Sequence, residues 1–252
     1  PVRQPKQEVC KCIERGVLMT ITFKVLSHLL AYPSDELRAA GPELKAALAT
    51  ENLVPPAERA ALGKLIDTLA TEDLIDLQER YVLLFDRTRA LSLHLFEHIH
   101  GESRDRGQAM ADLLGLYEEH GLSVDKRELP DYLPMFLEFL STMPLDQALE
   151  FLAQPLHVVA AIEERLSKRD TPYHSVFAAL LSISHGAKID AEVLAELTAQ
   201  PDDDPNDLAA LDRTWEDAEV TFGPGADGMT APGGQCPAAR ATLAGMDPAP
   251  GN

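Results

Sequence analysis

The feature that most constrains the fold is an apolar pattern of helical period that recurs along most of the chain. Leucine or isoleucine stands at positions 62, 65, 66 and 69, the spacing that places side chains on one face of a helix. Comparable patterns recur between residues 19 and 217. We find no convincing strand pattern and no internal repeat of about 20 to 50 residues. The sequence therefore predicts an all-α fold, a single helical bundle of about eight to ten helices.

Capping and breaking residues suggest where some of these helices begin and end. Ser34 can cap a helix that continues to about residue 48, and Thr71 can cap the helix that follows it. Asp131 can cap a third helix, which begins directly after it. A longer helix is expected over residues 145–168, with a bend at Pro155.

The two ends of the chain lack the pattern. Residues 1–18 have no usable period, and we interpret them as a flexible leader or a non-native extension. In residues 218–252, 12 of 35 positions are glycine or proline and few side chains are bulky. Such a tail buries too little surface to offset its conformational entropy, so we expect it to be disordered. Residues 19–217 form the expected helical domain.

The charge and the cysteine content exclude several classes of protein. The formal charge is −19, which disfavours nucleic-acid binding because phosphate neutralisation needs clustered lysine and arginine. Cys10, Cys12 and Cys236 form no paired motif, which fits a reducing compartment. No apolar stretch approaches the roughly 18 residues needed to span a bilayer. We expect a cytoplasmic protein that does not insert into the membrane.

Residues 81–107 are the most unusual stretch, because they mix histidines, acids and arginines with large apolar residues between two helical patterns. His94-Leu-Phe-Glu97-His98 matches H-x-x-E-H, in which two histidines bind zinc and the glutamate activates water. The sequence singles out no third zinc ligand. A zinc-dependent hydrolase is therefore one alternative. His98 and His100 fit either half of another metal site or an ordinary hydrogen-bonded pair.

A dense run of alternating charge opens the helix that is expected after Ser103. It consists of Glu102, Arg104, Asp105 and Arg106. One interpretation is ion pairing at a helix end, which contributes only a few tenths of a kcal/mol when exposed. The other is a polar rim beside an apolar groove, where it would fix the register of a bound peptide.

The segment Glu128-Leu129-Pro130-Asp131-Tyr132 allows a similar choice. Asp131 is either a helix cap or, together with Glu128, an acceptor for a bound basic segment. The residues alone thus lead to a helical, acidic binding protein. A generic acidic peptide-binding adaptor is the second alternative.

Three motifs resemble those of a known family. They are Y-V-L-L-F-D-R from Tyr81, L-F-E-H-I-H-G-E-S-R-D-R-G-Q-A-M over Leu95–Met110, and E-L-P-D-Y-L-P-M-F-L-E-F-L over Glu128–Leu140. Together they resemble the nitrate reductase assembly chaperones in the TorD/DmsD/NarJ group of redox-enzyme maturation proteins. The resemblance extends over about residues 19–222.

The resemblance implies an all-helical chaperone with no catalytic residue, metal or cofactor of its own. It implies binding to the N-terminal segment of the apo catalytic (alpha) subunit of respiratory nitrate reductase. That subunit is held in the cytoplasm until its molybdenum cofactor and iron–sulfur centres are inserted, before membrane attachment. Proteins of molybdenum cofactor biosynthesis are further expected partners.

One family motif is only partly retained. The wider family carries E-P-x-D-H, which this chain matches at Glu128, Pro130 and Asp131. Leu129 is inserted between the first two, and Tyr132 replaces the histidine. The replacement puts any pH-dependent role of that position in doubt.

These observations combine into one hypothesis for the site. We expect an amphipathic helix of the client to lie in an apolar groove, with Glu97, Glu128 and Asp131 meeting its basic end. The predicted client-binding residues are Tyr81, Phe85, Phe96, Glu97, His98, His100, Glu102, Arg104, Asp105, Arg106, Glu128, Leu129, Pro130, Asp131 and Tyr132.

Overall fold

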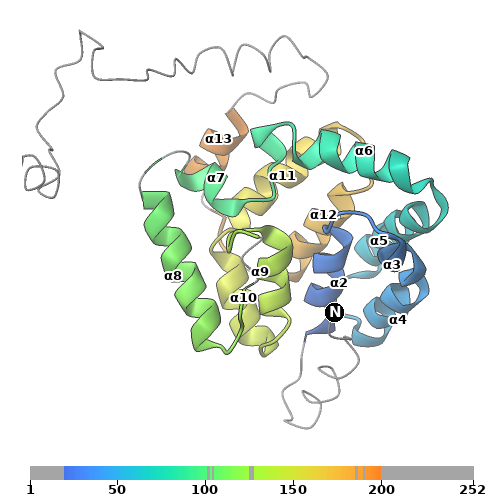
Figure 1. The fold of residues 1–252 in the computed structure, drawn as a ribbon, viewed down its shortest axis with the longest axis horizontal. Helices are drawn as coiled ribbons and strands as arrows, with labels where there is room; N and C mark the ends of the chain where they lie inside the picture. The colour runs from blue at the N-terminus through green and yellow to red at the C-terminus, as the bar shows by residue number, and fades with distance from the viewer. Residues whose placement is uncertain are drawn as a thin grey trace, which may run out of the picture. The chain divides into compact units, whose positions relative to one another are not determined.

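The chain folds into packed helices (Figure 1). The computed structural model describes residues 20–100, 103, 105–124, 128–184, 187–189 and 191–199. These residues contain twelve α-helices, one 3-10 helix and no strand. The prediction of an all-α fold is confirmed. The expected leader (1–18), the expected tail (218–252) and the last part of the expected helical domain (200–217) lie outside the described residues.

The helices follow one another in this order along the chain. They are α2 (Ile21–Leu29), α3 (Asp35–Ala39), α4 (Gly41–Glu51), α5 (Pro56–Thr71), α6 (Leu74–Phe85), η1 (Arg89–Leu91), α7 (Leu95–His100), α8 (Asp105–Glu119), α9 (Leu133–Leu140), α10 (Leu145–Ala153), α11 (Leu156–Lys168), α12 (His174–Ile183) and α13 (Ala191–Ala199).

The structure has more helices than predicted because two expected helices are divided and because α7 forms in the stretch expected to connect two helices. The helix expected after Ser34 is divided at Ala40 into α3 and α4. The single bent helix expected over 145–168 is wrong, since α10 and α11 are separate and are joined by Gln154 and Pro155. Proline has no N–H to donate and its ring crowds the preceding turn, so one helix ends before it and another begins after it.

The helix caps were predicted with mixed success. The Ser34 hydroxyl accepts a hydrogen bond from the Leu37 N–H at 3.2 Å, which confirms that cap. Thr71 is instead the last residue of α5, so its predicted role is wrong. The carboxylate of Asp73 caps α6 by accepting from the Ile75 N–H at 2.8 Å. Asp73 lies two residues after Thr71 and accepts from an N–H of the first turn of α6, which has no acceptor within the helix.

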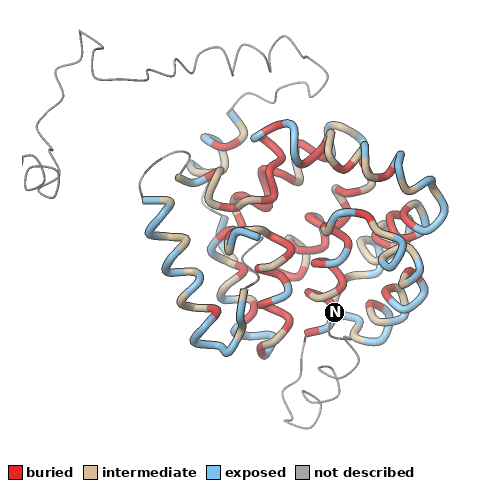
Figure 2. Tube along the Cα trace, in the orientation of Figure 1, coloured by how far each residue is buried: buried red, intermediate tan, exposed pale blue. Residues whose placement is uncertain are grey.

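The core lies where α2, α9, α11 and α12 meet their neighbours. Helix α2 packs against α9 and α4, α11 packs against α12 and α13, and α12 packs against α5. Buried residues gather on these helices, whereas α8 exposes most of its length (Figure 2). Phe23 and Phe177 are fully buried, and each such side chain contributes roughly 1.5–3 kcal/mol through the hydrophobic effect. Among the described residues, no helix combines the length and the apolar character required to cross a bilayer.

Candidate client-binding site

Two segments far apart in the chain are joined at the centre of the site. His94 and Tyr132 form an isolated antiparallel bridge. The Leu95 N–H donates to the Asp131 carbonyl at 3.0 Å, and the Leu133 N–H donates to the Leu93 carbonyl at 2.8 Å. The second and third family motifs therefore lie side by side.

The Asp131 side chain holds this junction together from inside. It is fully buried, and its Oδ2 accepts from the Phe96 N–H at 3.0 Å. Its Oδ1 accepts from His94 Nδ1 at 3.2 Å. Asp131 therefore caps α7, across the junction, and the prediction that it caps the helix directly after it is wrong. The residue before α9 is Tyr132, whose side chain makes no cap hydrogen bond.

The two histidines of the zinc-like motif have different surroundings. The hydrogen bond to Asp131 raises the pKa of His94 above its ordinary value. His98 is buried and its Nε2 donates to the Ser92 carbonyl at 2.8 Å, while burial lowers the pKa of His98. Within the part of the chain that the structure describes, no three His, Cys, Asp or Glu side chains form a group that could hold a metal. The zinc-hydrolase interpretation finds no support.

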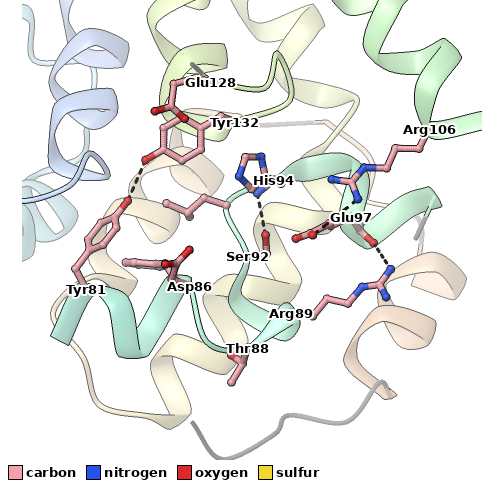
Figure 3. A pocket seen from close by; sticks show the side chains of 12 residues that line it. Tyr81, Asp86, Thr88, Arg89, Ser92, His94, Glu97, Arg106, Glu128 and Tyr132 are labelled. Carbon is pink, nitrogen blue, oxygen red and sulfur yellow. Dashed lines mark hydrogen bonds and ion pairs between the residues drawn. The ribbon is translucent and has the colours of Figure 1, made fainter. Parts of the chain in front are cut away.

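A pocket of about 490 Å³ opens beside the junction (Figure 3). The C-terminal half of α6, the connector from α6 to α7, the start of α8 and the 128–132 segment all contribute to it. It is lined by Tyr81, Phe85, Asp86, Thr88, Arg89, Ser92, Leu93, His94, Glu97, Arg106, Glu128 and Tyr132.

A pair of tyrosines forms one end of the pocket. The Tyr81 hydroxyl donates to the Leu30 carbonyl at 2.7 Å, and it lies 3.0 Å from the Tyr132 hydroxyl. Because Tyr81 has a single hydroxyl proton, Tyr132 is the donor between the two. Phe85 packs against Tyr81 with ring centroids 5.0 Å apart. Burial raises the pKa of Tyr81 and of Tyr132, so both phenols stay neutral.

The other end of the pocket carries two arginines around Glu97. Arg106 Nη1 lies 3.8 Å from the Glu97 carboxylate. Arg89 Nη2 donates to the Glu97 backbone carbonyl at 3.2 Å. Figure 3 shows both guanidinium groups on the same side of the pocket as Glu97. The two guanidinium groups therefore make this end of the pocket rich in hydrogen-bond donors.

Comparison with known proteins identifies the family. Residues 51–179 match the family described as the nitrate reductase delta subunit. This chain belongs to that family. It is 44% identical over 204 residues to the nitrate reductase molybdenum cofactor assembly chaperone NarJ of Escherichia coli (strain K12), with 80% of this chain and 85% of that protein covered.

Two further members of the family are also similar. NarW of the same strain, named as a probable chaperone of the same kind, is 41% identical over 200 residues, covering 79% of this chain and 83% of NarW. A NarJ protein of Bacillus subtilis (strain 168), also named as a probable chaperone, is 33% identical over 179 residues, covering 69% and 96%. The relatives are thus named as assembly chaperones.

The structure brings together about half of the residues predicted for the site of this family member. Those that line the pocket are Tyr81, Phe85, Glu97, Arg106, Glu128 and Tyr132. Those outside its lining are Phe96, His98, His100, Asp105, Leu129, Pro130 and Asp131. Glu102 and Arg104 lie outside the described residues.

The residues outside the pocket lining have other partners or surroundings. The Phe96 ring contacts His100 with centroids 5.5 Å apart. The Pro130 carbonyl accepts a hydrogen bond from Tyr117 at 2.8 Å, and the Ser103 hydroxyl donates to the Asp105 carboxylate at 3.2 Å. Leu129 follows the lining residue Glu128 in the chain and is 47% exposed.

Six lining residues were missed by the sequence analysis: Asp86, Thr88, Arg89, Ser92, Leu93 and His94. Asp86 stands inside the Y-V-L-L-F-D-R motif, so the sequence did carry a signal for it. His94 was considered only as a zinc ligand. The others sit in the irregular connector, where no periodicity indicates which side chains face a cavity.

Proposed function

We propose that this chain is an assembly chaperone of respiratory nitrate reductase. It binds the N-terminal segment of the apo catalytic subunit and holds that subunit competent for insertion of the molybdenum cofactor and iron–sulfur centres, before membrane attachment. The observation that carries the proposal is that segments from all three family motifs, far apart in the chain, line one pocket. The 44% identity to NarJ of Escherichia coli supports it.

The pocket suits the anchoring side chains of a helix. Its volume of about 490 Å³ falls within the range of roughly 300–1,000 Å³ that is typical of ligand pockets, which is room for a few side chains. Aromatic walls with a polar rim are characteristic of binding hot spots. Tyr81, Phe85 and Tyr132 supply the walls, and Leu129 offers apolar surface outside for the rest of an amphipathic helix.

In this proposal the chain performs no chemistry of its own. It acts in the cytoplasm by holding the client, and proteins of molybdenum cofactor biosynthesis deliver the cofactor to the held subunit. Asp131 and His98 support the pocket from within, because Asp131 bonds to the backbone of α7 and His98 bonds to the backbone of the connector.

Titration calorimetry tests the proposal directly. The probe is a synthetic peptide of the N-terminal segment of the catalytic subunit encoded with this chain. We expect saturable binding, a loss of about 10- to 100-fold in affinity for Tyr132→Ala, and no change for Ile75→Ala. Ile75 is the matched control because it is a 66% exposed apolar side chain outside the pocket lining.

Two results would contradict the proposal. One is no binding of the peptide to the wild-type chaperone. The other is equal binding of a scrambled peptide of the same composition, which would favour the generic acidic adaptor instead. Circular dichroism on each variant establishes that it is folded.

A further inference from the structure

The tyrosine end of the pocket is also its acidic end. Asp86 and Glu128 lie there with Tyr132 (Figure 3), and the negative charge of both carboxylates adds to the effect of burial in raising the pKa of Tyr132. Both carboxylates belong to exposed residues. Neither one forms an ion pair with any residue that the structure describes. We call Asp86, Glu128, Tyr81 and Tyr132 the acidic end.

The acidic end offers a ligand only hydrogen-bond acceptors. The proton of Tyr81 is donated to Leu30, and the proton of Tyr132 is donated to Tyr81. Carboxylates have no proton to donate. A ligand group that meets this end must therefore be a donor, and two adjacent negative charges favour a cationic one.

A second observation points to a missing polar partner in the same pocket. Thr88 lines the pocket and is 4% exposed, and its hydroxyl oxygen is buried without a hydrogen-bond partner among the described residues. Buried polar atoms are nearly always bonded, because leaving one unpaired costs about 1–3 kcal/mol. A polar group of a bound ligand is one way to supply that bond.

The opposite end has an excess of positive charge. Arg106 lies beside the Glu97 carboxylate, and Arg89 donates to the Glu97 backbone carbonyl, so Glu97 is the one acid that these two arginines contact among the described residues. The whole chain has a formal charge of −19, but beside the binding pocket two arginines lie with one acid, so the sign of the charge is locally reversed. We call Arg89, Arg106 and Glu97 the arginine end.

We propose that this charge polarity fixes the direction in which the client helix enters the pocket. A lysine or arginine side chain of the client occupies the acidic end, and an acidic client side chain faces the arginine end. The inference rests on the proposed function and adds the direction and the charge pattern of the bound segment.

The polarity discriminates between two orientations rather than adding much affinity. A helix inserted the other way round would place its cation against Arg89 and Arg106 and its acid against Asp86 and Glu128. Like charges brought together in this way are a common means of rejecting a wrong partner. The excess negative charge of the whole chain still attracts a basic segment over a longer range.

Charge exchange between chaperone and peptide tests the inference. The chaperone variants are Asp86→Lys with Glu128→Lys at the acidic end, Arg89→Glu at the arginine end, and Glu79→Lys as control. Glu79 is an exposed acid on α6 that does not line the pocket. The probes are the N-terminal peptide of the catalytic subunit and copies in which one basic residue becomes glutamate or one acidic residue becomes lysine.

We expect the acidic-end variant to bind the unmodified peptide about tenfold more weakly, and one basic-to-glutamate peptide to restore binding. The arginine-end variant should be rescued by an acidic-to-lysine change at a different peptide position. Glu79→Lys should change affinity little and be rescued by no peptide. The two rescuing positions then define the orientation of the bound helix.

The outcomes separate this inference from the proposed function. If the wild-type chaperone does not bind the unmodified peptide, the proposed function fails. If it binds, but Glu79→Lys reduces the binding free energy by half as much as the acidic-end variant, which changes the charge by twice as much, only net charge matters and the polarity inference is wrong. Rescue of both variants by the same peptide would also overturn it.

Discussion

Two regions beside the pocket differ in how they are held in the fold. One is the connector between α6 and α7, and the other is the regular helix α8. The connector is short and irregular, yet Leu91 and Leu93 are at most 3% exposed. Helix α8 has fifteen residues and regular geometry, yet Tyr117 is its one buried residue. A regular helix satisfies its own backbone and can lie at the surface, whereas an irregular segment must be held by its surroundings.

Buried side chains hold the connector in place. Arg165 Nη1 donates to the Ala90 carbonyl at 2.9 Å, and His98 donates to the Ser92 carbonyl. Asp131 accepts from the Phe96 N–H at the start of α7. Each bond satisfies a backbone group that no helix would satisfy. The pocket-facing side chains of this segment therefore stand on a fixed base.

Helix α8 has one buried anchor, the aromatic side chain of Tyr117, while Leu113 and Leu116 pack against the core partly buried. The Tyr117 ring lies 4.8 Å from Phe139, and its hydroxyl donates to the Pro130 carbonyl. Near its start, α8 also contributes Arg106 to the pocket. The contrast predicts that single changes will affect the two regions very differently.

The largest effect is expected for Tyr117→Ala. Removing a fully buried aromatic side chain typically costs about 3–5 kcal/mol, and here it removes the anchor of α8. Urea unfolding should show the loss of stability, and hydrogen exchange should accelerate in α8 while the connector stays protected. Leu114→Ala, at a 36% exposed position on the same helix, should change stability by less than about 0.5 kcal/mol. Protection of α8 in the Tyr117 variant would mean that other contacts hold it.

An intermediate effect is expected for Asp131→Ala. The change leaves the Phe96 N–H without its acceptor and removes the partner of His94, at a cost of about 1–3 kcal/mol. Peptide affinity should fall with stability, because the pocket wall moves. Asp131→Asn keeps an acceptor oxygen and should lose less of both, as measured by urea unfolding and calorimetry. Lower affinity at unchanged stability would instead indicate that Asp131 contacts the client itself.

The smallest effect is expected from the titration of His94. Its pKa is raised in the folded protein, so its protonation stabilises the fold fully below the ordinary pKa of 6.5. This contribution is lost as the pH rises through the folded pKa. It should remain under about 1 kcal/mol, because the ring is partly exposed.

The urea midpoints of wild type and of His94→Gln, measured as a function of pH, test the direction of this pH dependence of stability. The stability difference between the two proteins should shrink as the pH rises above neutrality. His100→Gln is the control, since the His100 ring contacts Phe96 and no carboxylate of the described residues. A difference that grows with pH would contradict the assignment.

The regular parts of this fold could be predicted from the sequence and its junctions could not. The spacing of Leu62, Leu65, Ile66 and Leu69 predicted the buried face of α5, and all four are buried. Periodicity reports only on residues a few positions apart. The capping of α7 by Asp131 joins residues 35 positions apart, so no local pattern could reveal it.

The same distinction applies to the residues of the candidate site. Aromatic residues on helical patterns or beside Pro130, such as Phe85 and Tyr132, could be assigned to the pocket in advance. The connector residues Thr88, Arg89 and Ser92 could not, because which of its side chains face a cavity depends on contacts with Arg165 and with α7.

The bridge between His94 and Tyr132 joins the two ends of the stretch that contains α7 and α8, so this stretch forms a closed loop. Doubling the length of a closed loop costs only about 0.6 kcal/mol in closure entropy. Residues inserted after the end of α8, at the exposed Ser123, should therefore leave the pocket intact, which makes this position a natural place to graft a tag or to cut the chain for circular permutation.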